Sequence, residues 1–246
     1  MLTSRTVDTV EHYWSSFLGC PREALSRAQT LVVPHAGLRD YHGLFAFLRH
    51  TLLVVSVPPH LLDTWRPQVI EWSPANVMRE DRLRCLVGSA AERVVGPAFV
   101  GYTEHGTFPP VHSGAVRVLG PHDGTAFAAL QAVCSPREWE HGGSQLGEQP
   151  MVGAYDGEYL VAVAGYTLWG GHIAHMAVVT HPQYRGQGYG RAVVSGLIAL
   201  HLTVVRMGCD KNGELVVLGR NNPSPHTVKG RPLYVHLNGL AMVLLK

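Results

Sequence analysis

The chain has 246 residues, of which 46% are hydrophobic and 15% are charged, a balance typical of globular proteins with one large or two small domains. Its formal net charge of +2 is small, and its Lys and Arg residues are scattered along the chain, which argues against a nucleic-acid-binding surface. We therefore expect a globular protein with a substantial core and no nucleic-acid partner.

The spacing of the cysteines and the length of the apolar segments indicate the cellular compartment in which the protein resides. No two cysteines have the C-x-x-C spacing of a zinc site, and their wide separation does not suggest a disulfide framework. They are Cys20, Cys85, Cys134 and Cys209. No apolar run reaches the roughly 18 residues that a membrane-spanning helix needs. The sequence thus predicts a cytoplasmic protein with buried free thiols, no metal site and no membrane association.

The first half of the chain predicts a small α+β domain. The expected elements are helices over residues 7–18, from Pro21 onward, over 61–72 and over 75–87, and strands over 30–33, 44–48 and 52–57. A polar loop over residues 34–43 carries His35, Arg39, Tyr41 and His42. These side chains could line a binding pocket, although the ordinary composition of a surface loop explains them equally well.

Residues 96–124 are rich in glycine and proline, which suits a connection between domains. We place a boundary within this segment, giving an N-terminal domain of residues 1–112 and a C-terminal domain of residues 113–246. The first domain could cap the functional site of the second, mediate a homodimer, or be a decayed copy of it.

The second half alternates strands and helices. In chain order we expect a strand over 115–119, helices over 122–134 and from 135 onward, strands over 151–155, 159–168 and 172–180, a helix over 190–207 and a strand over 214–218. The three middle strands form an antiparallel meander joined by tight turns. The right-handed crossover rule places the last strand parallel to residues 172–180.

The segment over residues 180–191 is the strongest functional signal in the sequence. It links a strand to a helix, and it contains three glycines and two arginines. The first N–H groups of a helix lack intrahelical acceptors and carry partial positive charge, so a glycine-rich turn there can hold a phosphate. The spacing differs from the G-x-G-x-x-G of a dinucleotide fold, and the lysine and hydroxyl of a P-loop are missing. A structural turn without a ligand is the remaining alternative.

The spacing Arg185-x-x-Gly188-x-Gly190 resembles the coenzyme A loop of the GNAT acetyltransferase superfamily. The order of elements over about residues 115–246 is similar to that family as well. The resemblance implies an α+β fold with a mixed, mostly antiparallel central sheet and flanking helices, preceded here by the smaller α+β domain. The last segment departs from the family pattern, because three prolines between residues 223 and 232 disfavour the short helix expected there.

The resemblance also implies which residues bind the co-substrate, acetyl-CoA. The strand before the loop would pair with the pantetheine arm through its backbone, the loop would hold the pyrophosphate, and an Asn follows the next strand. The residues implied are Val178, Val179, Thr180, Arg185, Gly186, Gln187, Gly188, Tyr189, Gly190, Arg191 and Asn222. A backbone N–H at Val178 or Val179 would act as donor to the acetyl carbonyl.

Acetyl transfer to an amine needs few side chains, because the amine attacks the thioester carbonyl directly. It does need a base for the ammonium and an acid for the thiolate. His175 is the candidate base, and Tyr234 is the candidate acid because the family often supplies a phenol there. Each has a structural alternative, as a hydrogen-bonded core histidine and a partly buried strand tyrosine. Glu138, Glu140 and Glu148 could instead act as a base through a water.

These observations favour an acetyl-CoA-dependent N-acetyltransferase, which moves an acetyl group to a primary amine of a small molecule or a peptide within a ternary complex. The alternative is a non-catalytic module that binds an acyl-CoA as a sensor or as a structural ligand. The sequence does not select the acceptor among aminoglycosides, polyamines, amino acids and peptides.

Overall fold

The computed structural model describes most of the chain. The described residues are 2–38, 41–72, 80–88, 91–104, 116–200, 204–209 and 238–245. The chain divides into two compact units: unit 1 comprises Met1–Thr6 and Gly101–Val235, and unit 2 comprises Val7–Val100 and His236–Lys246. The predicted boundary between residues 112 and 113 lies outside the described residues. Among the helices that are described, none is long and apolar enough to cross a membrane.

Unit 2 is built on a sheet with the strand order β1-β3-β2-β10-β4. The strands are β1 (Gln29–Pro34), β2 (Leu44–Arg49), β3 (Leu52–Val57), β4 (Ala91–Thr103) and β10 (Asn238–Leu245). β1 is parallel to β3, and the other neighbours are antiparallel. The three strands that the sequence predicts in the first half of the chain are confirmed.

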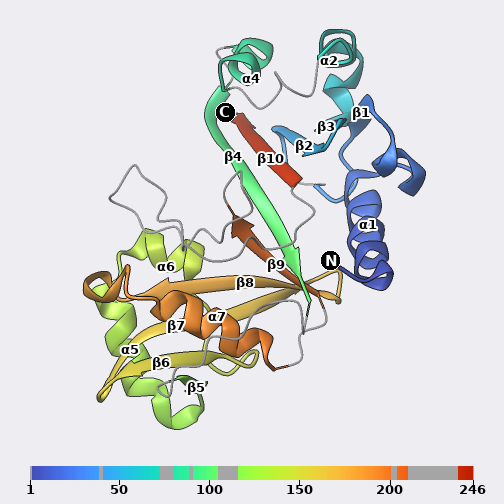
Figure 1. Ribbon diagram of the computed structural model, residues 1–246. Coiled ribbons are helices and arrows are strands. Elements are labelled where there is room, and N and C mark those ends of the chain that lie inside the picture. Colours follow the sequence, from blue (N-terminus) through green and yellow to red (C-terminus); the bar gives the residue numbers. More distant parts are fainter. Residues whose placement is uncertain are drawn as a thin grey trace. The chain divides into compact units, whose positions relative to one another are not determined.

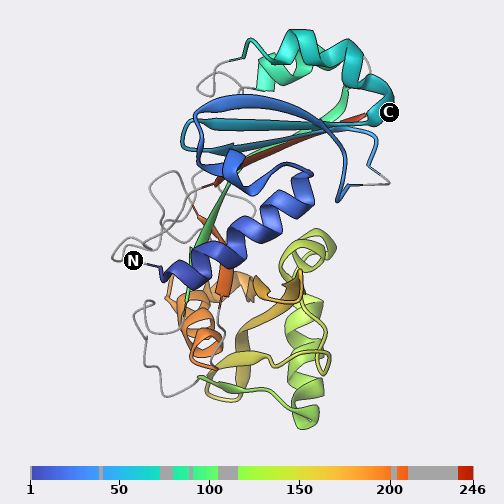
Figure 2. The ribbon, with the colours of Figure 1, turned by 90° about the vertical axis from the view of Figure 1, so that its right-hand side faces the viewer.

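Helix α1 (Ser4–Leu18) covers one face of this sheet, as the blue helix in Figure 2 shows. Its residue Trp14 packs against Phe45 and Phe47 of β2, with ring centroids 6.4 and 4.7 Å apart. The two phenylalanines are two residues apart in a strand, so both side chains point to the same face. The predicted helix over residues 7–18 is therefore confirmed, and it begins three residues earlier.

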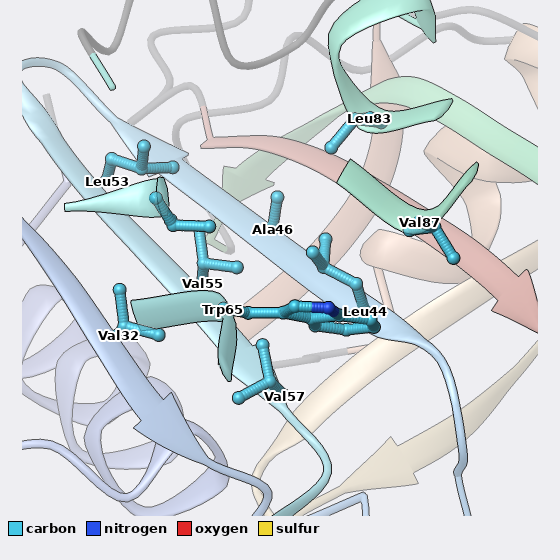
Figure 3. Packing of buried hydrophobic residues seen from close by; sticks show 10 residues of the cluster. Val32, Leu44, Ala46, Leu53, Val55, Val57, Trp65, Leu83 and Val87 are labelled. Atoms are coloured by element: carbon cyan, nitrogen blue, oxygen red, sulfur yellow. The ribbon is translucent and has the colours of Figure 1, made fainter. Parts of the chain in front are cut away.

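The opposite face of the same sheet carries α2 (Leu62–Val69) and α4 (Glu80–Val87). Trp65 from α2 and Leu83 from α4 belong to one core cluster with strand residues whose side chains point to this opposite face, such as Leu44 (Figure 3). The helix predicted over residues 61–72 is shorter than expected, and the first residues of the helix predicted over 75–87 lie outside the described part of the chain. The described part of the unit also contains two short 3-10 helices, η1 (Arg22–Ser26) and η2 (Pro59–Leu61).

Two strands of unit 2, β4 and β10, are not among the elements predicted from the sequence. β4 runs through Gly96 and Pro97, which were expected to belong to a loop-rich connection. Proline has no N–H to donate, and the pairing of β4 with β10 is irregular at this point, shifting register between Val95 and Ala98. The partner β10 comes from the far end of the chain, so no local pattern indicates the pairing.

Unit 1 has the strand order β9-β8-β7-β6-β5. The strands are β5 (Val116–Val118), β6 (Val152–Asp156), β7 (Tyr159–Trp169), β8 (Ile173–Thr180) and β9 (Val204–Cys209). Only β8 and β9 are parallel among these neighbours. The predicted strand at residues 115–119 and the antiparallel meander are confirmed, as is the α+β class with a mixed, mostly antiparallel sheet and flanking helices.

Helices lie on both faces of the unit 1 sheet. α7 (Tyr189–Ile198) packs on Ala162 and Ala164 of β7 and lies in front of the strands in Figure 1. α5 (Gly124–Val133) covers the other face, where Val163 of β7 contacts it through a second core cluster. α6 (Pro136–Gly142) packs near β8, and the 3-10 helices η4 (Pro121–Asp123) and η5 (Pro182–Tyr184) precede α5 and α7.

The predicted helix over residues 190–207 is wrong in its second half. α7 ends at Ile198, and residues Val204–Cys209 form β9, which pairs in parallel with the start of β8. The apolar pattern of this segment suits a buried helix and a buried strand equally well, and its β-branched residues favour the strand. The predicted strand over residues 214–218 lies outside the described residues.

Two of the three described cysteines agree with the expectation of buried free thiols. Cys20 and Cys134 are free and buried, whereas Cys85 is free and exposed on α4. Burial raises the pKa of the Cys20 and Cys134 thiols, so both are neutral at physiological pH. The side chain of Cys209 is outside the described part of the chain.

Candidate functional site

The connection from β8 to α7 is a tight turn that depends on glycine. After β8 ends at Thr180, η5 forms a single turn, and two glycines with positive φ follow, Gly186 at +75° and Gly188 at +89°. Residues with a side chain rarely adopt such φ values, so both positions favour glycine. A Cβ added to either glycine would meet no atom within 4 Å. The space beside both backbones is therefore open with respect to the described residues.

The beginning of α7 presents backbone donors to this open space. Gly188 is the N-cap, and the N–H of Ala192 donates to its carbonyl at 3.0 Å. The N–H groups of Tyr189, Gly190 and Arg191 come before this bond and have no acceptor within the helix. With the positive end of the helix dipole, they can bind an anion such as a phosphate. The Arg191 side chain adds a positive charge, and it has no ion-pair partner among the described side chains.

Side chains of the loop stabilise its shape. Nδ1 of His181 accepts a bond from the Gln183 N–H at 3.2 Å, and the Gln187 side-chain amide donates to the Gln183 carbonyl at 3.2 Å. The Tyr184 ring meets His181 and Tyr189 edge-on, with centroids 5.1 and 6.0 Å apart. Gln187 and Tyr189 thus have side-chain contacts within the loop, and their part in cofactor binding stays a prediction.

Arg185 binds protein groups on two sides. Its Nε donates to the Thr180 carbonyl at 3.2 Å, and its Nη2 lies 2.8 Å from Oε1 of Glu138 in α6. The guanidinium is therefore paired with a carboxylate of the same unit. The prediction that Arg185 supplies positive charge to a pyrophosphate does not take account of this pairing, which no sequence pattern indicates.

Glu138 is itself part of a capping box at the start of α6. Its carboxylate accepts bonds from the backbone N–H and the hydroxyl of Ser135, at 2.9 and 2.8 Å. Burial alone would raise the pKa of the Glu138 carboxyl, but the Ser135 bonds and the charge of Arg185 together hold it below its ordinary value. A paired carboxylate of lowered pKa is a poor base near neutral pH, which disfavours the water-mediated role considered for Glu138. The two other acidic candidates, Glu140 and Glu148, are exposed.

One edge of β8 is paired only at its beginning. β7 pairs with the opposite edge along the whole strand, from Ile173 to Thr180. On this edge, the described part of the parallel strand β9 pairs with Ile173, Ala174 and His175. Residues 176–180 have no strand beside them here among the described residues. We name this stretch the open edge of β8.

The direction of the backbone groups distinguishes between the predicted cofactor residues of β8. The His181 N–H donates to the Val161 carbonyl of β7 at 2.8 Å. Since successive residues of an antiparallel strand point their N–H and C=O groups to alternate edges, those of Val179 point to β7 and those of Val178 to the open edge. The same alternation places Thr180 at the open edge, where its carbonyl accepts the bond from Arg185. Of the two candidate donors, Val178 is therefore the one whose N–H points to the open edge.

The end of α6 closely approaches the open edge. A Cβ on Gly142 would lie 2.6 Å from the Val178 carbonyl oxygen, so only glycine fits there. In the following segment, Ser144 packs on Gly165 of β7, where a Cβ would lie 2.5 Å from the serine hydroxyl oxygen. The end of α6 and the residues after it thus form a wall beside Val178 on one face of the sheet.

His175 lies on the same face as this wall, just before the open edge. It is half-buried, between Thr167 of β7 and Arg206 of β9. Its ring packs against Trp169, with centroids 4.6 Å apart. Residues two apart in a strand share a face, so His175 points to the same side as Val179, which contacts the α5 core. This position suits a base for an acceptor bound near the wall, and that role stays a prediction.

Other predicted functional residues are not part of this arrangement. Asn222, Tyr234 and Arg39 lie outside the described residues. In the polar loop of unit 2, the His35 ring nitrogens contact the Ser56 hydroxyl and the Gly43 carbonyl at 2.7 and 2.8 Å. Burial raises the pKa of Tyr41 to about 12 and lowers that of His35. These contacts support the structural explanation of the loop rather than a binding pocket.

Comparison with known proteins agrees with the glycine loop and the order of elements around it. Residues 123–226 match the model of the acetyltransferase (GNAT) family. This range contains α5, α6, the meander, the loop and α7. A search of curated proteins found no significant match.

Several solved structures are similar to the chain at low identity. A putative GNAT acetyltransferase from Novosphingobium aromaticivorans is 17% identical with a TM-score of 0.39, over 63% of this chain and 67% of that one. A GNAT-family acetyltransferase from Colwellia psychrerythraea is 12% identical with a TM-score of 0.42, over 100% of this chain and 98% of that one. A GCN5-related N-acetyltransferase from Kribbella flavida is 13% identical with a TM-score of 0.41, over 65% and 63%.

Proposed function

We propose that the protein is an acetyl-CoA-dependent N-acetyltransferase acting on a primary amine, because residues 123–226 match the model of the acetyltransferase (GNAT) family. The observation that carries the proposal is the open edge of β8 leading directly to the donor-rich beginning of α7. The two features lie consecutively along the chain, so one extended ligand with a polar arm and a pyrophosphate can bind both.

The co-substrate fits the groups that this edge and loop present. The carbonyl of Val178 and the N–H of Thr180 point to the open edge and can pair with the amide groups of a pantetheine arm, as a strand would. The N–H groups of Tyr189, Gly190 and Arg191 can donate hydrogen bonds to the pyrophosphate, beside the open spaces at Gly186 and Gly188. Acetyl-CoA then places its thioester next to Val178, whose N–H can donate to the carbonyl oxygen as negative charge develops there.

The proposed reaction is direct transfer in a ternary complex. The neutral amine nitrogen attacks the thioester carbonyl carbon, a C–N bond forms, and the C–S bond breaks to release the thiolate of coenzyme A. The amine proton goes to a base, and the thiolate takes a proton from an acid or from water. We assign His175 as the base because it lies beside the wall at the end of α6, and Tyr234 as the acid.

Binding of acetyl-CoA by isothermal titration tests the first step of this proposal. In Gly188→Glu, we expect binding to be lost, because the side chain occupies the open space and its charge repels the pyrophosphate. Gly171→Glu is the matched control: Gly171 also has a positive φ, +75°, with no atom within 4 Å of an added Cβ, but it lies in the turn before β8. Equal loss in both variants, or no binding by the unaltered protein, would contradict the proposed site.

Detection of free thiol from acetyl-CoA in the presence of an amine panel tests the second step. Acceptor-dependent release is the expected outcome. Tight binding without release for any amine class would instead support an acyl-CoA-binding sensor.

A further inference from the structure

We propose that Arg185 is a positioning residue, which holds the coenzyme A loop through Glu138 rather than contacting the pyrophosphate. This inference rests on the proposed function, and it assigns a binding determinant, Glu138, that lies outside the glycine loop. Glu138 belongs to α6, and Arg185 follows η5, so the pair connects the helix beside the open edge with the turn that begins α7.

The Arg185 guanidinium contacts both the end of β8 and the start of α6, and so holds these two segments and the loop together. Nε donates to the Thr180 carbonyl, where β8 ends, and Nη2 lies 2.8 Å from the Glu138 carboxylate. The other oxygen of that carboxylate accepts two bonds from Ser135. Arg185 therefore links the last residue of β8 to the capping box of α6, and the loop begins from this linked point.

Burial and charge both favour the structural assignment. The Arg185 and Glu138 side chains are 27% and 13% exposed, so water screens the pair less than a fully exposed one. Because the pair is close to neutral as a whole, it adds little net positive charge for an anion. The α7 donors and Arg191 supply that charge, as they lie in the first turn of the helix.

Fixing the loop in advance is how the pair would raise affinity. A ligand that binds a loop already in its bound conformation does not lose free energy in ordering it. The turn also contains two glycines, residues with large conformational freedom when unconstrained. Breaking either side of the pair should thus weaken acetyl-CoA binding to a similar extent.

A double-mutant cycle distinguishes this assignment from direct contact. We expect Glu138→Gln and Arg185→Gln each to raise the Kd for acetyl-CoA about tenfold, and the double variant to be no weaker than either single one. If Arg185 bound the pyrophosphate directly, Glu138→Gln would remove a repulsive charge and leave the affinity unchanged or higher. That result would overturn the proposal, as would additive losses in the double variant.

Two controls separate this effect from general destabilisation and from failure of the proposed function. Glu140→Gln removes an exposed charge from the same helix and should leave the Kd unchanged. Arg117→Gln breaks another ion pair of unit 1, with Asp123, and should lower the thermal midpoint without changing the Kd. If the unaltered protein does not bind acetyl-CoA, the proposed function fails; if it binds and Glu138→Gln binds equally well, only the positioning role fails.

Discussion

At the scale of single residues, the structure separates two kinds of polar group near the glycine loop. Arg185 and Glu138 are bound to each other, and they make further hydrogen bonds with Thr180 and Ser135 respectively. The N–H of Val178 instead points to the open edge of β8, and the first turn of α7 begins at Gly188, beside which the described residues leave open space. The ligand-binding capacity of this site therefore lies more in its backbone than in its side chains.

His175 gives a prediction at this scale. In His175→Ala, we expect kcat to fall by about 100-fold or more, because loss of a general base removes a contribution of this size. The Kd for acetyl-CoA should stay unchanged, since the β8 groups that face the open edge belong to the backbone. Steady-state kinetics with an accepted amine, together with titration, measure both quantities. Unchanged turnover would exclude the catalytic role and leave the contact with Trp169 as its function.

At the scale of secondary-structure elements, Asp123, which directly precedes α5, connects the start of this helix to the sheet of unit 1. Its carboxylate accepts bonds from Arg117 of β5 at 2.9 Å, from the Gly120 N–H at 2.8 Å and from the Tyr155 hydroxyl of β6 at 2.7 Å. The Arg117 guanidinium also lies over the Tyr155 ring, 4.6 Å from its centroid. These bonds hold the pKa of Asp123 well below its ordinary value, and those from Arg117 contribute most.

The resulting prediction concerns stability and pH. Because the pKa of Asp123 is lower in the folded state, its ionised form contributes stability above the unfolded pKa of about 3.9, and the contribution is lost as pH falls further. We expect Asp123→Asn to lower the free energy of unfolding by about 2 kcal/mol at pH 7. The difference from the unaltered protein should shrink below about pH 4. Urea unfolding at several pH values measures this, and Glu158→Gln, at an exposed position, should show no such difference.

At the scale of the whole molecule, the chain does not divide into two consecutive halves. Unit 2 takes its strand β10 from residues at the far end of the chain, and β10 pairs with both β2 and β4. A strand between two others satisfies the backbone groups of both neighbours. The integrity of unit 2 therefore depends on residues that lie beyond the family match.

Deleting residues 238–246 should destabilise unit 2 selectively. We expect the thermal midpoint of this unit to fall strongly, because the removal exposes one edge each of β2 and β4. Hydrogen exchange resolves the two units: protection in β2 and β4 should be lost, while β7 keeps its protection. Removing Lys246 alone serves as the control, and equal protection in the deletion variant would contradict the pairing.

The sequence by itself determined the local elements and the kind of site. Alternation and turn residues predict the meander of β6, β7 and β8, and helix signals with the glycine spacing predict the anion-binding loop, because each of these depends on neighbours along the chain. The tertiary structure alone decided the partners: β10 beside β4, β9 in place of a longer helix, and Glu138 beside Arg185. These pairings join segments far apart in the chain, and their free energy comes from packing and hydrogen bonds that no local pattern contains.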